Sequence, residues 1–330
     1  MATIGSAAGF SRELALSPRT IFFTPCQFFW QCRRFFESED KAYRSSQFEA
    51  LFKTYAHTAY TFNFGDPKSA FGVWWQWVAN YAGRRLSVAS DASSAFAGLV
   101  GFFQRKTGCT PMLGLWEEQL ALHLYWNIGQ SLMNPRRIPC TTVPVPSDFP
   151  SWSWLSVVPN HTNGCNFSRP LDFGHSGLTE SVRLVEFLAS WEGPAYTSRL
   201  RHSRLRVSAL TKHATITTVP GGNKRRRMPR CHWDRNGVPS LGAGWECFLQ
   251  YEYPPNTCLS VLLLQLYQTA STYPGMSLSG DIFDRFLILM EDGASGFADR
   301  YYRIGVGRVV TADHQEPVFL NSERGIIELV

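Results

Sequence analysis

The segments of this chain whose residue types could support catalysis or ligand binding are short and incomplete. Gly174-His175-Ser176-Gly177 combines a histidine with a serine, but it lacks the Gly-x-Ser-x-Gly spacing of a hydrolase nucleophile turn. Gly242-Ala243-Gly244 lacks the third glycine of a dinucleotide-binding fingerprint. Cys231 and His232 are adjacent, but no second pair of residues completes four zinc ligands at the usual spacing. We therefore expect no catalytic residue, no cofactor and no metal site, and hence a protein that is not an enzyme.

The strongest concentration of charge is the run Lys224, Arg225, Arg226 and Arg227. Such a run can bind the phosphates of a nucleic acid or direct a protein to the nucleus. It follows turn residues, and like charges are not buried unpaired, so a solvated hairpin loop is the preferred interpretation. No aromatic residues interleave with these charges, which makes nucleic acid the weaker hypothesis for a partner.

Two tryptophans lie two residues apart in Pro150-Ser151-Trp152-Ser153-Trp154. In an extended strand, Trp152 and Trp154 would point to the same face. Indoles bury a large apolar area, and each N–H requires an acceptor. The pair is therefore typical of a structural anchor close to polar groups. A stacking platform for a nucleobase or a sugar is the alternative.

The composition is that of a folded protein. The chain has 330 residues, of which 44% are hydrophobic, 14% aromatic and 18% charged, so it can bury a substantial core. Its length favours two domains. The net charge of +6 permits contact with acidic partners without requiring it.

Several features indicate an intracellular protein. The eight cysteines include no Cys-x-x-Cys pair and form no dense framework, so we expect reduced thiols. The first ten residues lack the pattern of a secretory signal, and the longest apolar run, around 259–267, is too short to span a bilayer. We expect a cytoplasmic location, with the nucleus as the alternative implied by the basic run.

Helical periodicity dominates before residue 150. Trp74, Trp77, Val78 and Tyr81 recur at offsets of three and four, which predicts a helix over about 70–84. A second helix should follow Asp91, which occupies an N-cap position, and a third should cover 115–128 with Trp116 on its apolar side. Before these helices, a turn at 16–20 should lead into a buried strand. The Pro-rich stretch 138–149 predicts an extended connector.

Strand patterns dominate after residue 150. A short helix is expected within 174–191, because Leu184, Phe187 and Leu188 fall at helical spacing. The remaining segments predict strands separated by turn residues. They are 205–210, 214–219, 258–267, 283–290, 301–310 and 326–330. The overall prediction is an α+β protein, with a mainly α-helical region over 1–149 and an antiparallel β sandwich or barrel over 150–330.

Six pieces of this chain, taken in order, resemble one known family. They are Leu16-Ser17-Pro18-Arg19-Thr20 with Phe23-Thr24 and Phe29-Trp30-x-Cys32; Trp74-x-x-Trp77-Val78-x-x-Tyr81; Arg84, Leu86-Ser87 and Asp91; Leu113-Gly114-Leu115-Trp116 with Leu124 and Trp126; Pro150-Ser151-Trp152-Ser153-Trp154; and Tyr302-Arg303-Ile304-Gly305-Val306 with Glu323-Arg324. Together they resemble the region that follows the HET domain in fungal heterokaryon-incompatibility proteins. The resemblance covers most of the chain. In it, Arg19 and Asp91 are expected to be buried ion-pairing or capping groups rather than ligand contacts.

The resemblance implies a role in non-self recognition and programmed cell death. The Tyr-x-Ala-Leu-Ser-Tyr-x-Trp-Gly and Leu-Trp-Ile-Asp-x-Leu-Cys-Ile-x-Gln segments that mark the HET domain, which resembles the TIR fold, do not occur in this sequence. We therefore expect a truncated or degenerate member, or a partial gene model, acting as a non-enzymatic accessory or regulatory portion that binds protein partners. The alternatives are a TIR-like NAD-processing enzyme and a nuclear nucleic-acid-binding module that uses residues 224–227.

Overall fold

The fold is that of a computed structural model, which describes a little under three fifths of the chain. The described residues are 19–23, 27–32, 36–42, 44–45, 67–82, 92–128, 148–157, 167–168, 178–218, 234–235, 238–239, 245–250, 253–254, 256–270, 282–293, 299–311 and 317–330.

The first two predicted helices are present. α2 spans Pro67–Ala82, and Trp74, Trp77, Val78 and Tyr81 are all buried on it, as their spacing of three and four requires. α3 spans Ala92–Thr107 and begins directly after the position predicted to be its cap. Asp91 itself lies outside the described residues.

The prediction of a third helix over 115–128 is wrong. Pro111–Met112 (β5) and Leu115–Trp116 (β6) pair instead as a small antiparallel hairpin. The two residues between them, Leu113 and Gly114, both have positive φ, as a type I′ turn requires. This turn holds Trp116 in an extended conformation. The residues after Trp116 that are apolar at helical spacing therefore form only short helices. These are η2 (Glu117–Gln119) and α4 (Leu120–Leu124), followed by β7 (Asn127–Ile128), which pairs with β8 (Phe167–Ser168).

The predicted β region from residue 200 onward is confirmed. Its strands are β11 (Leu200–Thr217), β12 (Asp234–Arg235), β13 (Val238–Pro239), β14 (Trp245–Leu249), β15 (Cys258–Ala270), β16 (Ile282–Glu291), β17 (Arg300–Thr311) and β18 (Glu323–Leu329).

The short helix expected within 174–191 is wrong, because this segment holds β9 (Leu178–Glu180) and β10 (Arg183–Trp191). The pairing of β10 with β11 shifts register between Leu184 and Glu186, so Val185 forms a bulge. The extra residue breaks the alternation of sides. Leu184 and Phe187 both pack against the core although they are three residues apart. A bulged strand thus produced a spacing that is typical of a helix.

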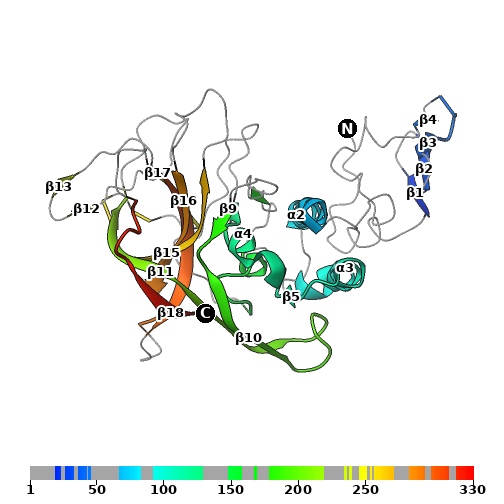
Figure 1. Ribbon diagram of the computed structural model, residues 1–330. Coiled ribbons are helices and arrows are strands. Elements are labelled where there is room, and N and C mark those ends of the chain that lie inside the picture. Colours follow the sequence, from blue (N-terminus) through cyan, green and yellow to red (C-terminus); the bar gives the residue numbers. More distant parts are fainter. Residues whose placement is uncertain are drawn as a thin grey trace.

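The pairings of the main sheet close into a ring at β11 (Figure 1). The order is β10-β11-β18-β17-β16-β15-β9, with β14 beside β17, and the second half of β11 also pairs with β15. Five strands, namely β11, β15, β16, β17 and β18, therefore close a ring. All its pairings are antiparallel except that of β17 with β18, which is parallel over two residues of each strand. The sheet is therefore mixed, and the predicted purely antiparallel arrangement is wrong at this one pairing.

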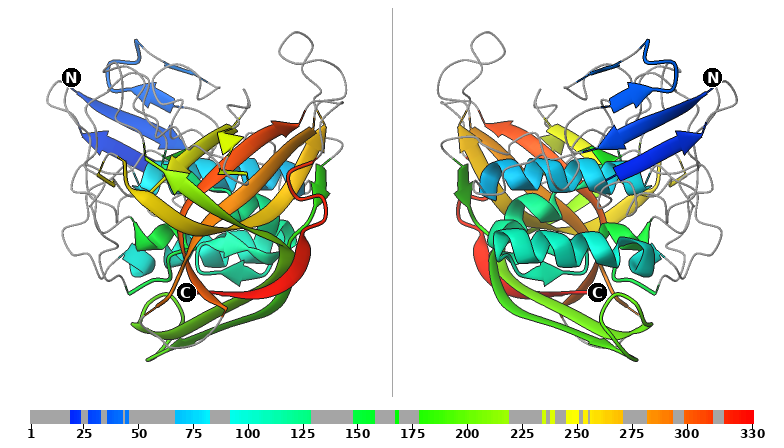
Figure 2. Two further views of the ribbon diagram at one scale, coloured as in Figure 1. Left: turned by 90° about the vertical axis from the view of Figure 1, so that its left-hand side faces the viewer. Right: turned by 90° about the vertical axis from the view of Figure 1, so that its right-hand side faces the viewer.

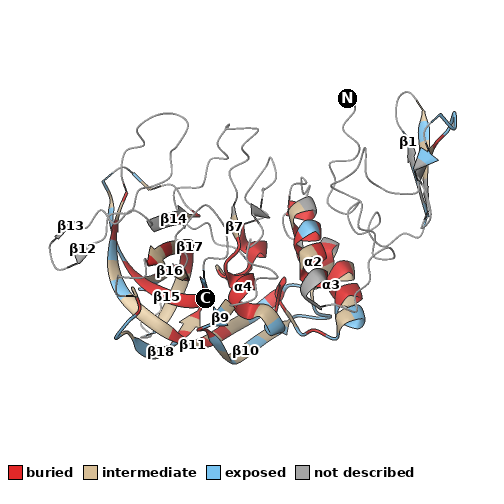
Figure 3. Cartoon of the chain, turned by 45° about the horizontal axis from the view of Figure 1, so that its top comes forward, coloured by how far each residue is buried: buried red, intermediate tan, exposed pale blue. Residues whose placement is uncertain are grey.

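The sheet is buried on both faces where it is central. Figure 3 shows the buried residues along β15 and β16. Leu262 and Leu264 of β15 join one apolar cluster, whereas Val261 and Leu263, which alternate with them, join a second. The first cluster also contains the apolar faces of α2, α3 and α4, which lie together against one side of the sheet (Figure 2). The core is thus a helical layer joined to a strand layer.

The described residues before 46 do not confirm a mainly helical N-terminal region. They form a four-stranded antiparallel sheet of β1 (Arg19–Phe23), β2 (Phe28–Cys32), β3 (Phe36–Ser38) and β4 (Arg44–Ser45). The expectation that the first strand is buried is also wrong, because Ile21 is 45% and Phe23 is 80% exposed. Arg19, expected to be a buried ion-pairing or capping group, is exposed as well.

Candidate functional site

The turn at Leu113 and Gly114 is the point where distant segments of the chain meet. The indole N–H groups of Trp74 and Trp154 both donate to the Gly114 carbonyl oxygen, at 3.3 and 2.8 Å. Gly114 has a φ of +88°, and a Cβ there would lie 2.7 Å from Nε1 of Trp154. Only glycine allows the indole to approach the backbone this closely.

The segment around Trp152 and Trp154 is not the strand that its alternation predicts. It turns and enters a short 3-10 helix, η3 (Trp154–Ser156), whose N-cap is Ser153. The Ser153 hydroxyl donates to the Leu113 carbonyl at 2.6 Å and accepts the Leu155 N–H at 3.2 Å. Both tryptophans have no exposed area. This burial supports the structural-anchor interpretation over an open stacking platform.

The same segment also contacts the last strands of the chain. The Ser151 N–H donates to an oxygen of Val330 at 3.0 Å, and the Ser151 hydroxyl donates to that oxygen too. The Ser151 hydroxyl oxygen accepts the backbone N–H of Arg303 at 2.8 Å. These bonds fix β17 and the end of β18 against the helical layer.

Arg303 is a buried cation that the sequence did not reveal. Its guanidinium lies 3.5 Å from the centre of the Trp126 ring and donates to the Trp126 carbonyl oxygen. The Trp126 indole in turn donates to the Trp152 carbonyl at 2.8 Å. The side-chain amide of Gln250 lies beside both the backbone carbonyl and the guanidinium of Arg303. Stacking and hydrogen bonding to fixed groups replace the water that a buried guanidinium loses.

The β10–β11 hairpin is fastened to this core at its tip. Tyr196, in the loop between the strands, has a φ of +64°, and its hydroxyl oxygen accepts the Leu113 N–H at 3.1 Å. Its ring packs on Trp191, with ring centres 5.2 Å apart. Burial raises the pKa of Tyr196 to about 12, although hydrogen bonds from Leu113 and Gly114 oppose the shift. The hydroxyl is therefore neutral and acts as a structural acceptor.

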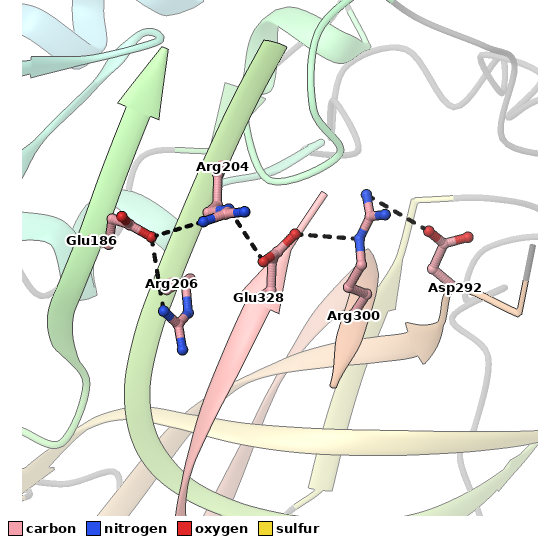
Figure 4. Close-up of polar contacts among 6 residues, drawn as sticks. All are labelled: Glu186, Arg204, Arg206, Asp292, Arg300 and Glu328. Atoms are coloured by element: carbon pink, nitrogen blue, oxygen red, sulfur yellow. Dashed lines mark hydrogen bonds and ion pairs between the residues drawn. The ribbon is translucent and has the colours of Figure 1, made fainter. Parts of the chain in front are cut away.

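A chain of ion pairs runs across the solvent-facing side of the strands β10, β11, β18 and β17 (Figure 4). Glu328 of β18 bridges Arg204 of β11, at 3.4 Å, and Arg300 of β17, at 3.3 Å. The network extends at one end to Glu186, which contacts Arg204 and Arg206, and at the other to Asp292, which contacts Arg300. It spans the seam where β17 and β18 close the ring.

Exposed apolar side chains occur beside these charges. Val185 is 45%, Leu188 is 48% and Ile326 is 48% exposed. Leu188 lies opposite Arg204 in the β10–β11 pairing. The outer surface of β10, β11 and β18 therefore mixes arginines, glutamates and exposed aliphatic groups. We refer to it as the outer face.

The motif residues that are described come together, with one exception. Trp74, Tyr81, Trp116, Trp152 and Trp154 are all buried. Ring centres are 4.9 Å apart for Trp74 and Trp116 and 6.0 Å apart for Tyr81 and Trp154. The exception is Arg19, which is exposed at the start of β1.

The segments whose residue types could support catalysis, metal binding or phosphate binding lie outside the described residues. They are 174–177, Cys231, His232, 242–244 and the basic run 224–227. Within the described part of the chain, no group of three or more His, Cys, Asp or Glu side chains could hold a metal ion. No helix there is long and apolar enough to cross a membrane.

The buried ionisable groups outside the motif residues include His123 and Asp284. His123 of α4 packs against the rings of Phe71 and Trp75, and burial lowers its pKa to about 3. Asp284 of β16 is fully buried, and burial raises its pKa although Gln268 and Gln265 donate to it at 2.8 and 2.5 Å. Both side chains are fully buried, so each lies within the packed interior of the described fold.

No family model, curated protein or solved structure matches the chain. The resemblance to heterokaryon-incompatibility proteins is therefore one of sequence motifs alone, and it stays a prediction.

Proposed function

We propose that the chain is a non-enzymatic accessory or regulatory portion of a fungal heterokaryon-incompatibility protein. It contributes to non-self recognition, and to the cell death that follows, by contacts with protein partners. The described surface that is best suited to such contacts is the outer face, where arginines, glutamates and exposed aliphatic side chains lie together.

The observation that carries this proposal is the convergence of the motif pieces. Trp74, Gly114 and Trp154 come from three separate pieces and meet at one carbonyl group. Ser151 and Arg303, from two pieces 152 residues apart, are joined by a hydrogen bond. Pieces that are far apart in the chain but bond to one another form one structural unit. Their role is to hold the helical layer to the sheet, which leaves recognition to the surface.

The proposal is tested in the fungus that carries the gene. The gene is deleted, and the deletion strain is paired with a panel of strains that give an incompatibility reaction with the parent. We expect the death of fused cells to be altered in at least one pairing and restored by the intact gene. Unchanged reactions in every pairing would contradict the proposed function.

A biochemical arm separates this proposal from an enzymatic one. The purified chain is incubated with NAD, and nicotinamide release is followed over time. We expect no release above that of a heat-denatured sample. Turnover by the folded chain would overturn the non-enzymatic proposal in favour of a TIR-like activity.

A further inference from the structure

We propose that Arg183, Ser208 and Arg324 form a binding site for a single phosphate group on the outer face. The three side chains come from β10, β11 and β18, respectively. Such a site goes beyond the proposed function, which names no ligand.

The strand pairings bring these three residues together on one side of the sheet. Arg183 pairs with Ser208 across β10 and β11. Ser208 also pairs with Ile326 of β18, which lies two residues after Arg324. Both arginines are exposed. The residues on either side of Ser208 are fully buried in the first apolar cluster, so the Ser208 hydroxyl points to the outer face.

The guanidinium of Arg324 is held beside the start of β10. Its Nη1 donates to the carbonyl oxygens of Ser181 and Ser208, at 2.8 and 3.1 Å. Ser181 precedes Arg183 by two residues, so the long side chains of both arginines can reach one anion. Nε and Nη2 of Arg324 make no hydrogen bond within the described part of the chain and remain as donors. A guanidinium that is already positioned loses less entropy when it binds.

Neither arginine is neutralised by a carboxylate of the described residues. Glu186 and Glu328, on the same face, contact the other arginines of the ion-pair chain. Glu180 and Glu323 lie near the two arginines in sequence, but neither glutamate forms an ion pair within the described ranges. Two unpaired positive charges repel one another, and an anion between them replaces this repulsion with attraction.

The number of free charges selects the kind of anion. A phosphate monoester carries about two negative charges at neutral pH and has three strong acceptor oxygens. These match two guanidinium groups and one hydroxyl, whereas a carboxylate brings a single charge. A nucleic acid or an anionic membrane presents many phosphates and requires several free cations, but the arginines of the neighbouring ion-pair chain are already paired. We therefore assign the site to one isolated phosphate group.

The test uses inorganic phosphate and a short fluorescein-labelled peptide with one phosphoserine between valines. Control peptides carry serine or aspartate in place of the phosphoserine. Binding to the full chain is measured by fluorescence anisotropy at low salt, with inorganic phosphate added as a competitor. We expect the phosphoserine peptide to bind, inorganic phosphate to displace it, and both control peptides to bind at least about tenfold more weakly.

The competition distinguishes two sources of the phosphate group. Inorganic phosphate that binds as tightly as the peptide would identify free phosphate as the ligand. A peptide that binds about tenfold more tightly than inorganic phosphate would identify a phosphorylated side chain of a partner.

Matched variants locate the site. The Arg183 side chain makes no hydrogen bond or ion pair within the described residues, so R183Q should remain folded. We expect R183Q to weaken binding about tenfold or more, because a charge-assisted hydrogen bond is lost. R201Q is the control, because Arg201 is also exposed and unpaired in the described part of the chain but lies near the start of β11. R201Q should bind as the parent does.

Three results would overturn the inference. The first is that neither phosphate probe binds at low salt. The second is that the aspartate peptide binds as tightly as the phosphoserine peptide, because the site would then not select a doubly charged anion. The third is that R183Q binds as the parent does, or that R201Q loses as much affinity as R183Q.

Discussion

At the scale of single residues, the Leu113–Gly114 turn shows how one short motif holds distant segments of the chain together. Leu113 adopts a φ of +48°, which is unfavourable for a residue with a Cβ. Its two backbone polar groups are nevertheless both used, by Tyr196 and by Ser153. Gly114 receives two indole N–H groups at one carbonyl. The surrounding contacts thus offset the local strain.

Replacing Gly114 with alanine should therefore be strongly destabilising. The new Cβ would meet the Trp154 ring, and the positive φ would add backbone strain. We expect G114A to lower the free energy of unfolding by about 2–4 kcal/mol, measured by urea denaturation. The control is G72A in α2, where no atom lies within 4 Å of the added Cβ. That variant should gain about 0.5–1 kcal/mol. Equal effects of the two variants would contradict the importance of the turn.

His123 makes stability depend on pH. Its ordinary pKa is 6.5, and burial lowers the pKa to about 3 in the folded state. Below pH 6.5 the unfolded chain therefore binds a proton that the folded chain does not. Stability should fall by up to about 1.4 kcal/mol for each pH unit between 6.5 and 3.

The variant H123F should flatten this dependence, because phenylalanine cannot take up a proton. The measurement is the free energy of unfolding at pH 6.5, 5.5 and 5.0 for both proteins. We expect the parent to lose more stability than H123F over this interval. If the free energy of unfolding fell equally with pH in the parent and in H123F, protonation of His123 would not destabilise the folded state.

At the scale of elements, the ion-pair chain crosses the weakest part of the ring. β17 and β18 share only two residue pairs, Arg300 with Glu328 and Tyr301 with Leu329. Glu328 then adds side-chain contacts to strands on both sides of the seam. The charges are partly exposed, so each pair contributes little, but the network reinforces a short ladder.

E328Q should remove both ion pairs at this seam while keeping the shape of the side chain. We expect the free energy of unfolding to fall by about 1 kcal/mol at low salt, because two partly exposed pairs are lost. The loss should shrink in 1 M salt, which screens surface charges. E323Q, at an exposed position at the start of the same strand, should change stability by less than about 0.5 kcal/mol. A salt-independent effect of E328Q would contradict an ionic role.

At the scale of the whole molecule, one apolar cluster joins the helices to the sheet. It contains the tryptophans of α2, β6 and the 152–154 segment together with side chains of β11, β15, β16 and β18. Because the layers share this cluster, they should unfold together rather than in sequence.

W154A tests this coupling. Trp154 contacts Tyr81 and Phe96 of the two long helices, and its N–H is bonded to Gly114. Its loss should lower the free energy of unfolding by about 3–5 kcal/mol. Circular dichroism should follow the helices, and hydrogen exchange of β15 and β16 should follow the sheet. We expect both to shift to the same lower midpoint. A shift in the helical signal alone would show that the layers are independent.

The sequence by itself determined the elements whose patterns are local. α2 follows from the spacing of Trp74, Trp77, Val78 and Tyr81, since a helix repeats every 3.6 residues and one face must be buried. The β15–β18 strands follow from runs of branched and aromatic residues between turn residues. The burial of Trp152 and Trp154 was predicted as well, because paired indoles in an alternating segment rarely remain exposed.

Only the tertiary structure decided the features that depend on distant contacts. The hairpin turn before Trp116 replaced a predicted helix, because two indoles and a serine hold its backbone. β10 resembled a helix in sequence, because a bulge places Leu184 and Phe187 on one side. The closure of the ring and the burial of Arg303 depend on pairings between strands far apart in the chain. Local periodicity reports which side of an element is apolar, whereas the partner that covers it is set by packing across the whole fold.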